Sequence, residues 1–122
     1  MTDIYDIPYF SEEHHQFRDL VRDFAESEIS PFSGELDREH KFHWDNVKKM
    51  AELGFLGIPW DPELGGTGMD DISYIIAVEE LARVDASHSI TCSAHITLGT
   101  SPIVEFGTEE QKQKYVPLMA SG

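Results

Sequence analysis

Cysteine and basic residues are both scarce in this sequence. Cys92 is the single cysteine among 122 residues, so a disulfide framework within the chain is excluded, which fits a reducing compartment. Lys and Arg total 9 against 23 Asp and Glu, and the formal net charge is −14. A chain this acidic repels nucleic-acid phosphates and anionic membrane surfaces, so neither is expected as a partner.

Long apolar runs and targeting signals are absent as well. No unbroken apolar stretch is long enough to cross a bilayer. The N-terminal residues, MTDIYDIPYF, are acidic and lack the basic region of a secretory signal or the arginines of a transit peptide. These absences favour a cytoplasmic location. The apolar content of 40% is ordinary for a globular chain, and the length allows one domain at most.

The two-residue alternation of a β-strand is also missing, whereas helical spacing recurs. One apolar stripe predicts a helix over residues 11–29, ended by Pro31 and followed by the polar connection SGELDREHKF. The stripe consists of Phe17, Leu20, Val21 and Phe24. A second helix is predicted over about 44–53 with Gly54 just after it, and then a loop, GFLGIPWDPELGGTGMD, with five glycines and two prolines.

A third helix is predicted over about 72–84, capped by Asp71 and apolar on nearly all sides, which predicts burial between other helices. Glu79 and Glu80 interrupt it and are expected at the surface or against a partner. The uncharged stretch ASHSITCSAHITLGTSPIVEF predicts two helical pieces split near residues 99–101, with Pro102 in the first turn of the second.

The final predicted helix starts with Thr108 as N-cap and Gln111 three residues later, the spacing of a capping box. It has barely reached residue 118 or 119 when the sequence finishes. The fold class predicted from these segments is all-α, a compact bundle of five or six helices.

One side of the helix around residues 87–98 alternates small and medium apolar residues. At helical spacing the side carries Ser87, Ile90, Thr91, Ala94, His95 and Leu98. Such a side either lets another helix approach closely or leaves a groove for a slender apolar ligand. The spacing alone favours close packing.

Other candidate chemistry is weak. His95 could act as an acid or base, but no carboxylate orients it, and a histidine bonded to backbone or lining a pocket is the simpler interpretation. His40 and His43 could offer two ligands from one helical turn, but no second pair of metal-site spacing supports them, and His14 and His15 would point in different directions. No metal site is expected.

Two further features have simple structural explanations. Cys92 has no cationic neighbour along its helix, so a buried, inert thiol is expected. The cluster LGGTG at residues 64–68 lacks the Lys-Ser/Thr of a phosphate-binding loop, so a tight turn that needs positive φ angles is expected. No nucleophile triad or catalytic carboxylate pair is present.

Five stretches taken in order carry a specific resemblance: FRDLVRDFAESEISP, AELGFLGIP, PELGGTGMD, VEELARVDAS and TLGTSPIVEFGTEEQKQKYVPLMASG. From about residue 11 to residue 122 the chain resembles the N-terminal helical domain of the acyl-CoA dehydrogenases. Residues 1–10 then form an N-terminal extension. The middle β domain and the C-terminal helical domain of that family are absent from these 122 residues.

The resemblance implies a full-length flavoenzyme that holds FAD, desaturates acyl-CoA thioesters at the α,β carbons and passes electrons to an electron-transfer flavoprotein, as a homotetramer. It implies no catalytic or cofactor-binding residue in this chain, because the family's catalytic glutamate and most flavin contacts lie in the other domains. The fragment alone is therefore expected to be inactive and not to hold FAD.

The resemblance also changes the preferred interpretation of the helix around residues 87–98: a groove for a ligand is now favoured over close packing against another helix. The positions that match the family's acyl-pocket wall are Ile90, Thr91, Ala94, His95 and Leu98. His95 places a polar ring against the expected path of a long saturated chain, which favours short, branched or functionalised acyl groups. The alternative is a stand-alone helical binding module that lacks the flavin domains.

Overall fold

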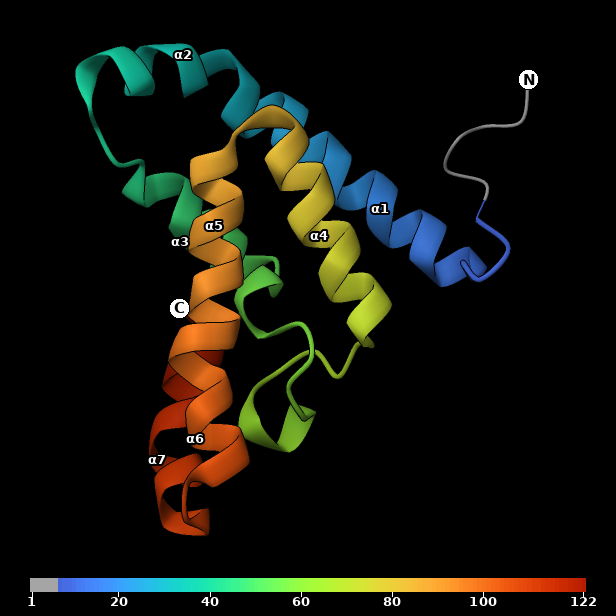
Figure 1. Ribbon diagram of the computed structural model, residues 1–122, viewed down its shortest axis with the longest axis vertical. Coiled ribbons are helices and arrows are strands. Elements are labelled where there is room, and N and C mark those ends of the chain that lie inside the picture. Colours follow the sequence, from blue (N-terminus) through green and yellow to red (C-terminus); the bar gives the residue numbers. More distant parts are fainter. Residues whose placement is uncertain (1–6) are drawn as a thin grey trace.

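The computed structural model describes residues 7–122, and over that range the chain forms five helical rods and no strand (Figure 1). The predicted all-α bundle is therefore confirmed. Residues 1–6 of the predicted N-terminal extension lie outside the described part of the chain.

Two of the rods each contain a π-helical turn. The first rod joins α1 (Glu12–Phe24), a π-helical turn (Ala25–Ile29) and α2 (Ser30–Glu39). Next come α3 (Trp44–Glu52) and α4 (Asp71–Val84). The fourth rod joins α5 (Ala86–Ala94), a second π-helical turn (His95–Thr100) and α6 (Ser101–Phe106), and α7 covers Glu109–Ala120. In Figure 1, α4 lies beside both α1 and α5, and α7 runs along α6.

Two predicted helix interruptions are wrong. The first rod continues past Pro31 as far as Glu39, so most of the predicted polar connection is helical, and the fourth rod has no gap at residues 99–101. In both rods the proline is the second residue after a π-helical turn. Such a turn holds one extra residue and shifts the hydrogen-bond register, so the following proline sits in a first turn, where its missing N–H costs little. The position predicted for Pro102 is confirmed.

The helix ends follow the sequence closely elsewhere. Thr108 and Gln111 form the predicted capping box, with donor–acceptor distances of 2.9 and 3.2 Å. Gly54 follows α3 with φ +79°, a conformation that a residue with a Cβ rarely adopts. The predicted cap of α4 is off by one residue: Asp70, not Asp71, accepts the backbone N–H of Ser73 at 2.9 Å.

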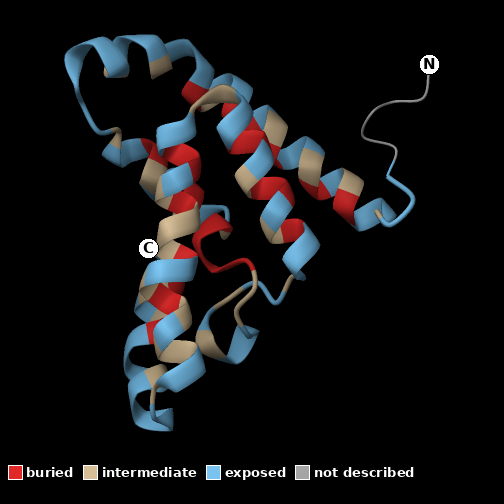
Figure 2. Cartoon of the chain, viewed as in Figure 1, coloured by how far each residue is buried: buried red, intermediate tan, exposed pale blue. Residues whose placement is uncertain are grey.

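The core lies between α1, α3, α4 and α5, and the short 3₁₀ segment Phe55–Gly57 enters its centre (Figure 2). Phe55 is completely buried and meets Phe17 and Phe24 of α1 edge to face, with ring centroids 6.0 and 5.6 Å apart. Three of the four residues in the predicted α1 stripe are buried, while Leu20 is 47% exposed. The α1 stripe thus buries a narrower face than its spacing suggested.

α4 is less enclosed than its composition predicts. Ile72 and Ile75 are 36% and 56% exposed, so one apolar side of α4 has no cover within the described chain. The prediction that Glu79 and Glu80 reach the surface or a partner is confirmed for Glu79, which is exposed. It is wrong for Glu80, which is 1% exposed and points inward.

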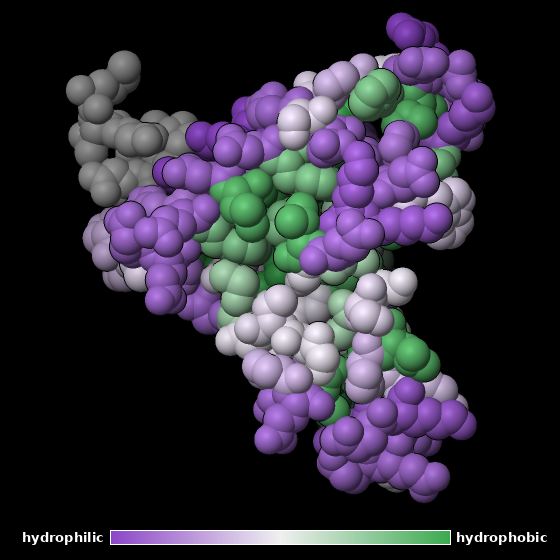
Figure 3. All heavy atoms as spheres, turned by 180° about the vertical axis from the view of Figure 1, so that it is seen from behind, coloured by the Kyte–Doolittle hydropathy of each residue, from purple (hydrophilic) through white to green (hydrophobic). Residues whose placement is uncertain are grey.

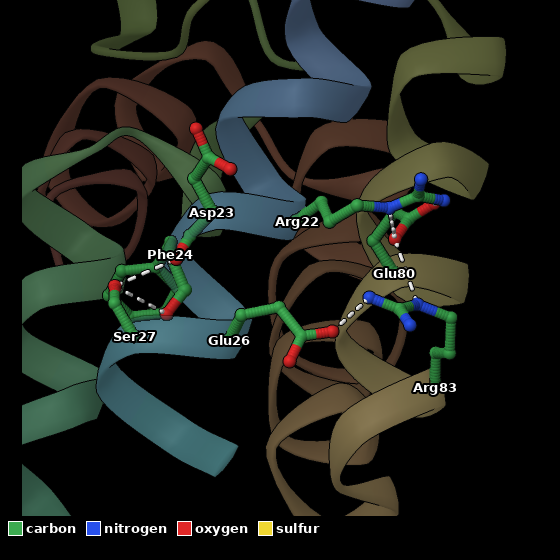
Figure 4. Close-up of polar contacts among 7 residues, drawn as sticks. All are labelled: Arg22, Asp23, Phe24, Glu26, Ser27, Glu80 and Arg83. Atoms are coloured by element: carbon green, nitrogen blue, oxygen red, sulfur yellow. Dashed lines mark hydrogen bonds and ion pairs between the residues drawn. The ribbon is translucent and has the colours of Figure 1, made fainter. Parts of the chain in front are cut away.

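Glu80 is buried because two arginines neutralise it (Figure 4). Arg22 of α1 donates two hydrogen bonds to its carboxylate at 2.8 and 3.0 Å, and Arg83 donates a third at 3.3 Å. Arg83 also donates to Glu26, which lies in the first π-helical turn. Charge-assisted bonds of this kind fix α1 and its π-helical turn against α4.

Candidate functional site

The predicted acyl-pocket residues lie on one rod, in α5 and the π-helical turn that follows it. Four of them, which we call the α5 face, are Ile90, Thr91, Ala94 and Leu98. Ile90 is 65% exposed and Leu98 is 78% exposed. Both large apolar side chains on this rod are therefore open to contact from outside the described chain.

Thr91 and Ala94 lie between these two and are half-buried. The hydroxyl of Thr91 donates to the backbone carbonyl of Ser87 at 2.8 Å, so its polar group is already paired and the α5 face stays mainly apolar. Ala94 contributes only a methyl group. The side chains in the middle of the α5 face are therefore smaller than those at its two ends.

His95 is directed away from the α5 face. Its Nε2 lies 2.6 Å from the backbone carbonyl of Met119 near the end of α7. Because a carbonyl only accepts, Nε2 is the donor here. Among the alternatives for this residue, the bond to backbone is the one present in the structure. His95 holds α7 to the fourth rod, and its proposed place in an acyl pocket stays a prediction.

A buried histidine that the sequence reasoning missed lies near the start of α5, before the α5 face. His88 is 5% exposed, its Nδ1 donates to Asp85, and its Nε2 accepts from the Asn46 side chain at 3.3 Å. Burial acts to raise the pKa of Asp85, but hydrogen bonds from His88 and Ser87 outweigh it and hold that pKa below its ordinary value. The i, i+3 spacing of Asp85 and His88 was the signal available in the sequence.

Cys92 is completely buried in α5, as predicted, and its thiol donates to the Phe55 carbonyl at 3.4 Å. Burial raises the pKa of Cys92 to about 12, so the reactive thiolate is scarce at neutral pH. The predicted burial of the thiol is confirmed, and its inertness stays a prediction.

No group of three or more metal-binding side chains comes together within residues 7–122. His40 ends α2 in the left-handed conformation with φ +53°, while His43 is the N-cap of α3, so the two do not share one helical turn. The structure of this segment gives no support to a metal pair.

The glycine cluster at residues 64–68 is a turn, as predicted: Gly65 and Gly68 have φ angles of +85° and +65°. A Cβ on Gly66 would lie 2.0 Å from the backbone oxygen of Trp60, so this glycine is required for close chain packing. The turn at residues 64–68 therefore packs directly against the protein's own backbone.

None of the helices in the described range has the length and apolar character needed to cross a membrane.

Comparison with known proteins assigns the family. The sequence model for "Acyl-CoA dehydrogenase, N-terminal domain" matches residues 11–122. A short-chain specific acyl-CoA dehydrogenase of Clostridium acetobutylicum is 48% identical over 112 residues, which are 92% of this chain and 30% of that protein. The chain thus spans about 30% of the length of the curated relatives that it matches.

Solved structures agree with this assignment. A chain in a structure described as an electron transferring flavoprotein of Acidaminococcus fermentans superposes with a TM-score of 0.90 and 43% identity, over 95% of this chain and 30% of that chain. An acyl-CoA dehydrogenase of Bacillus anthracis, complexed with FAD, gives a TM-score of 0.82 and 37% identity over 93% and 19% of the two chains. This chain belongs to the acyl-CoA dehydrogenase family and corresponds to its N-terminal domain.

Proposed function

We propose that this chain is the N-terminal helical part of an FAD-dependent acyl-CoA dehydrogenase that desaturates an acyl-CoA thioester at the α,β carbons. The observation that carries the proposal is the match of residues 11–122 to one domain of relatives that are about three times as long. Within this enzyme, the 122 residues supply a wall of the acyl pocket, and FAD and the catalytic groups belong to the parts of the protein that follow.

The α5 face supports this role. An acyl chain needs an elongated apolar surface with few polar groups. Ile90 and Leu98 provide apolar ends, and Ala94 between them leaves room for a chain to lie against the helix. The backbone carbonyls of this rod are mostly occupied by helix hydrogen bonds, so the wall presents little unpaired polarity to a hydrocarbon.

The exposed apolar surface supports the proposal that the complete enzyme has further domains. Seen from behind, apolar side chains gather near the centre of the molecule, while hydrophilic ones cover its extremities (Figure 3). Ile72 and Ile75 of α4 add to this exposure. We propose that further domains of the same enzyme cover part of this surface, that an electron-transfer flavoprotein accepts the electrons, and that the complete enzyme is a homotetramer.

The test has two steps. The gene is first sequenced beyond the codon for Gly122, and the complete protein is then produced with FAD and assayed with butyryl-, hexanoyl- and octanoyl-CoA. A stop codon directly after Gly122, or no desaturation of any of the three, would favour the stand-alone binding module instead.

Ala94→Phe tests the place of the α5 face in that enzyme. The added ring fills the centre of the face, so kcat/KM for octanoyl-CoA should fall at least about tenfold relative to butyryl-CoA, since a misfit of one methylene in an apolar pocket costs about 1–3 kcal/mol. Ala94→Ser, which adds a single hydroxyl group, is the control. Unchanged relative kcat/KM in Ala94→Phe would remove Ala94 from the pocket.

A further inference from the structure

A recess lies beside the N-terminal end of α5. It is enclosed by α2, the link between α2 and α3, the start of α3 and the first turns of α5, and its volume is about 190 Å³. Figure 1 shows that link beside the upper, N-terminal end of α5. Since a water molecule takes up roughly 30 Å³, the recess has room for about six waters or a short chain of carbon and oxygen atoms.

The recess and the proposed acyl wall meet. Thr91, one of the four residues of the α5 face, also lines the recess, and so does Ser87, one turn before it on the same side of the helix. A chain that lies along the α5 face toward the N-terminus of α5 therefore arrives at the recess. The recess is the natural continuation of the acyl wall beyond Ile90.

Most polar groups around the recess are already paired. Both carboxylate oxygens of Asp85 accept hydrogen bonds from Ser87, and one also accepts from His88. The two ring nitrogens of His88 are occupied by Asp85 and Asn46. The hydroxyl of Thr91 donates to backbone. These groups hold the wall in place and do not need a ligand.

His43 is different. As N-cap of α3 it accepts the backbone N–H of Asn46 at Nδ1, with a distance of 3.1 Å. Nδ1 must then carry the lone pair, so the neutral ring has its proton on Nε2. Within residues 7–122 no hydrogen bond from that Nε2 is present. His43 thus lines the recess, and its ring carries one donor that has no partner among the described residues.

The groups around the recess favour a neutral partner. The carboxylate of Asp37 lines it and would repel a second carboxylate. The ammonium of Lys41 also lines it but already pairs with Glu39, and a ligand ammonium has no lone pair with which to accept the proton of His43. A hydroxyl group can accept a hydrogen bond from His43 and donate one to the carboxylate of Asp37, so it suits both residues without bringing a further charge into the recess.

We infer that this recess receives the far end of the acyl group and favours an acyl-CoA whose terminal carbon carries a hydroxyl. The inference rests on the proposed function. His43 is the residue that determines this specificity, and the size of the recess sets how far the acyl chain extends.

The test uses the complete, FAD-loaded enzyme with hexanoyl-CoA, 6-hydroxyhexanoyl-CoA and butyryl-CoA. The wild-type enzyme should favour 6-hydroxyhexanoyl-CoA over hexanoyl-CoA about fivefold in kcat/KM, the effect of one net hydrogen bond. His43→Asn keeps a good N-cap for α3 but removes the Nε2 donor, so the ratio of the two kcat/KM values should fall to about one. Far-UV circular dichroism checks that the variant is folded.

A second pair of variants tests the recess by its volume. Ser33→Phe places a ring in the recess and should lower kcat/KM for both six-carbon substrates about tenfold relative to butyryl-CoA. Gly34→Phe is the matched control, because a Cβ at Gly34 meets nothing within 4 Å, and it should leave these ratios unchanged.

The outcomes separate the two proposals. If the wild-type enzyme desaturates none of the three substrates, the proposed function fails and the recess inference fails with it. If it desaturates butyryl-CoA but shows no preference for the hydroxylated substrate, or if His43→Asn keeps that preference, the recess inference alone is overturned.

Discussion

Glu80→Gln gives the sharpest test of how the helices are held together. The substitution keeps the size and shape of a side chain that is 1% exposed, but it removes the negative charge between Arg22 and Arg83. The amide also replaces one acceptor oxygen by an NH₂ group that faces arginine donors. Up to three charge-assisted hydrogen bonds are weakened or broken at the contact between α1 and α4.

The expected loss can be bounded from the exposure of the arginines. Removing one partner of a fully buried ion pair costs about 3–5 kcal/mol because the other charge is left uncompensated. The side chains of Arg22 and Arg83 are 31% and 38% exposed, so water can reach both after the change. The loss should therefore lie at the lower end, about 3 kcal/mol, which lowers the melting temperature by about 10 °C for a domain of this size.

Urea denaturation followed by circular dichroism measures the free energy of unfolding of each variant. Glu79→Gln is the matched control, because Glu79 is the neighbouring, less buried residue on the same helix, and it should change stability by less than about 0.5 kcal/mol. If Glu80→Gln is no more destabilising than Glu79→Gln, the buried charge network does not hold α1 against α4 and the reasoning is refuted.

Three further substitutions or reactions test other contacts. The backbone N–H of Ser73 chiefly holds the pKa of Asp70 below its ordinary value. Asp70→Ala should therefore lower the free energy of unfolding, measured in urea at pH 7, by about 1 kcal/mol, and this loss should shrink as the pH falls below about 4. A loss that stays constant with pH would contradict this. The thiol of Cys92 should react with a disulfide reagent at least roughly 100-fold more slowly in the native protein than in urea at pH 8; equal rates would contradict its burial. Gly66→Ala should destabilise the protein by more than about 2 kcal/mol, as measured by the urea midpoint, because the new Cβ would meet a backbone carbonyl at 2.0 Å. The control Gly34→Ala should be neutral or stabilising, because a Cβ there meets nothing within 4 Å.

Several features could be predicted from the sequence because they depend on residues close together in the chain. The capping box at Thr108 and Gln111 and the left-handed glycine after α3 are decided within four residues. The exposed side of the fourth rod that carries Ile90 and Leu98 was singled out from helical spacing alone. The family was recognisable because five such local stretches occur in a fixed order.

The sequence by itself determined an all-α chain, the positions of most helices and the face that we propose for the acyl group. Only the tertiary structure decided which distant segments meet: Glu80 is buried because Arg22, 58 residues away, reaches it, and His95 is directed inward by a carbonyl 24 residues later in the chain. The same holds for the helix that continues past Pro31, since it passes through a π-helical turn that packs against α4, a distant segment of the chain. Local pattern fixes what a segment tends to form, whereas burial and charge pairing depend on neighbours that only folding brings together.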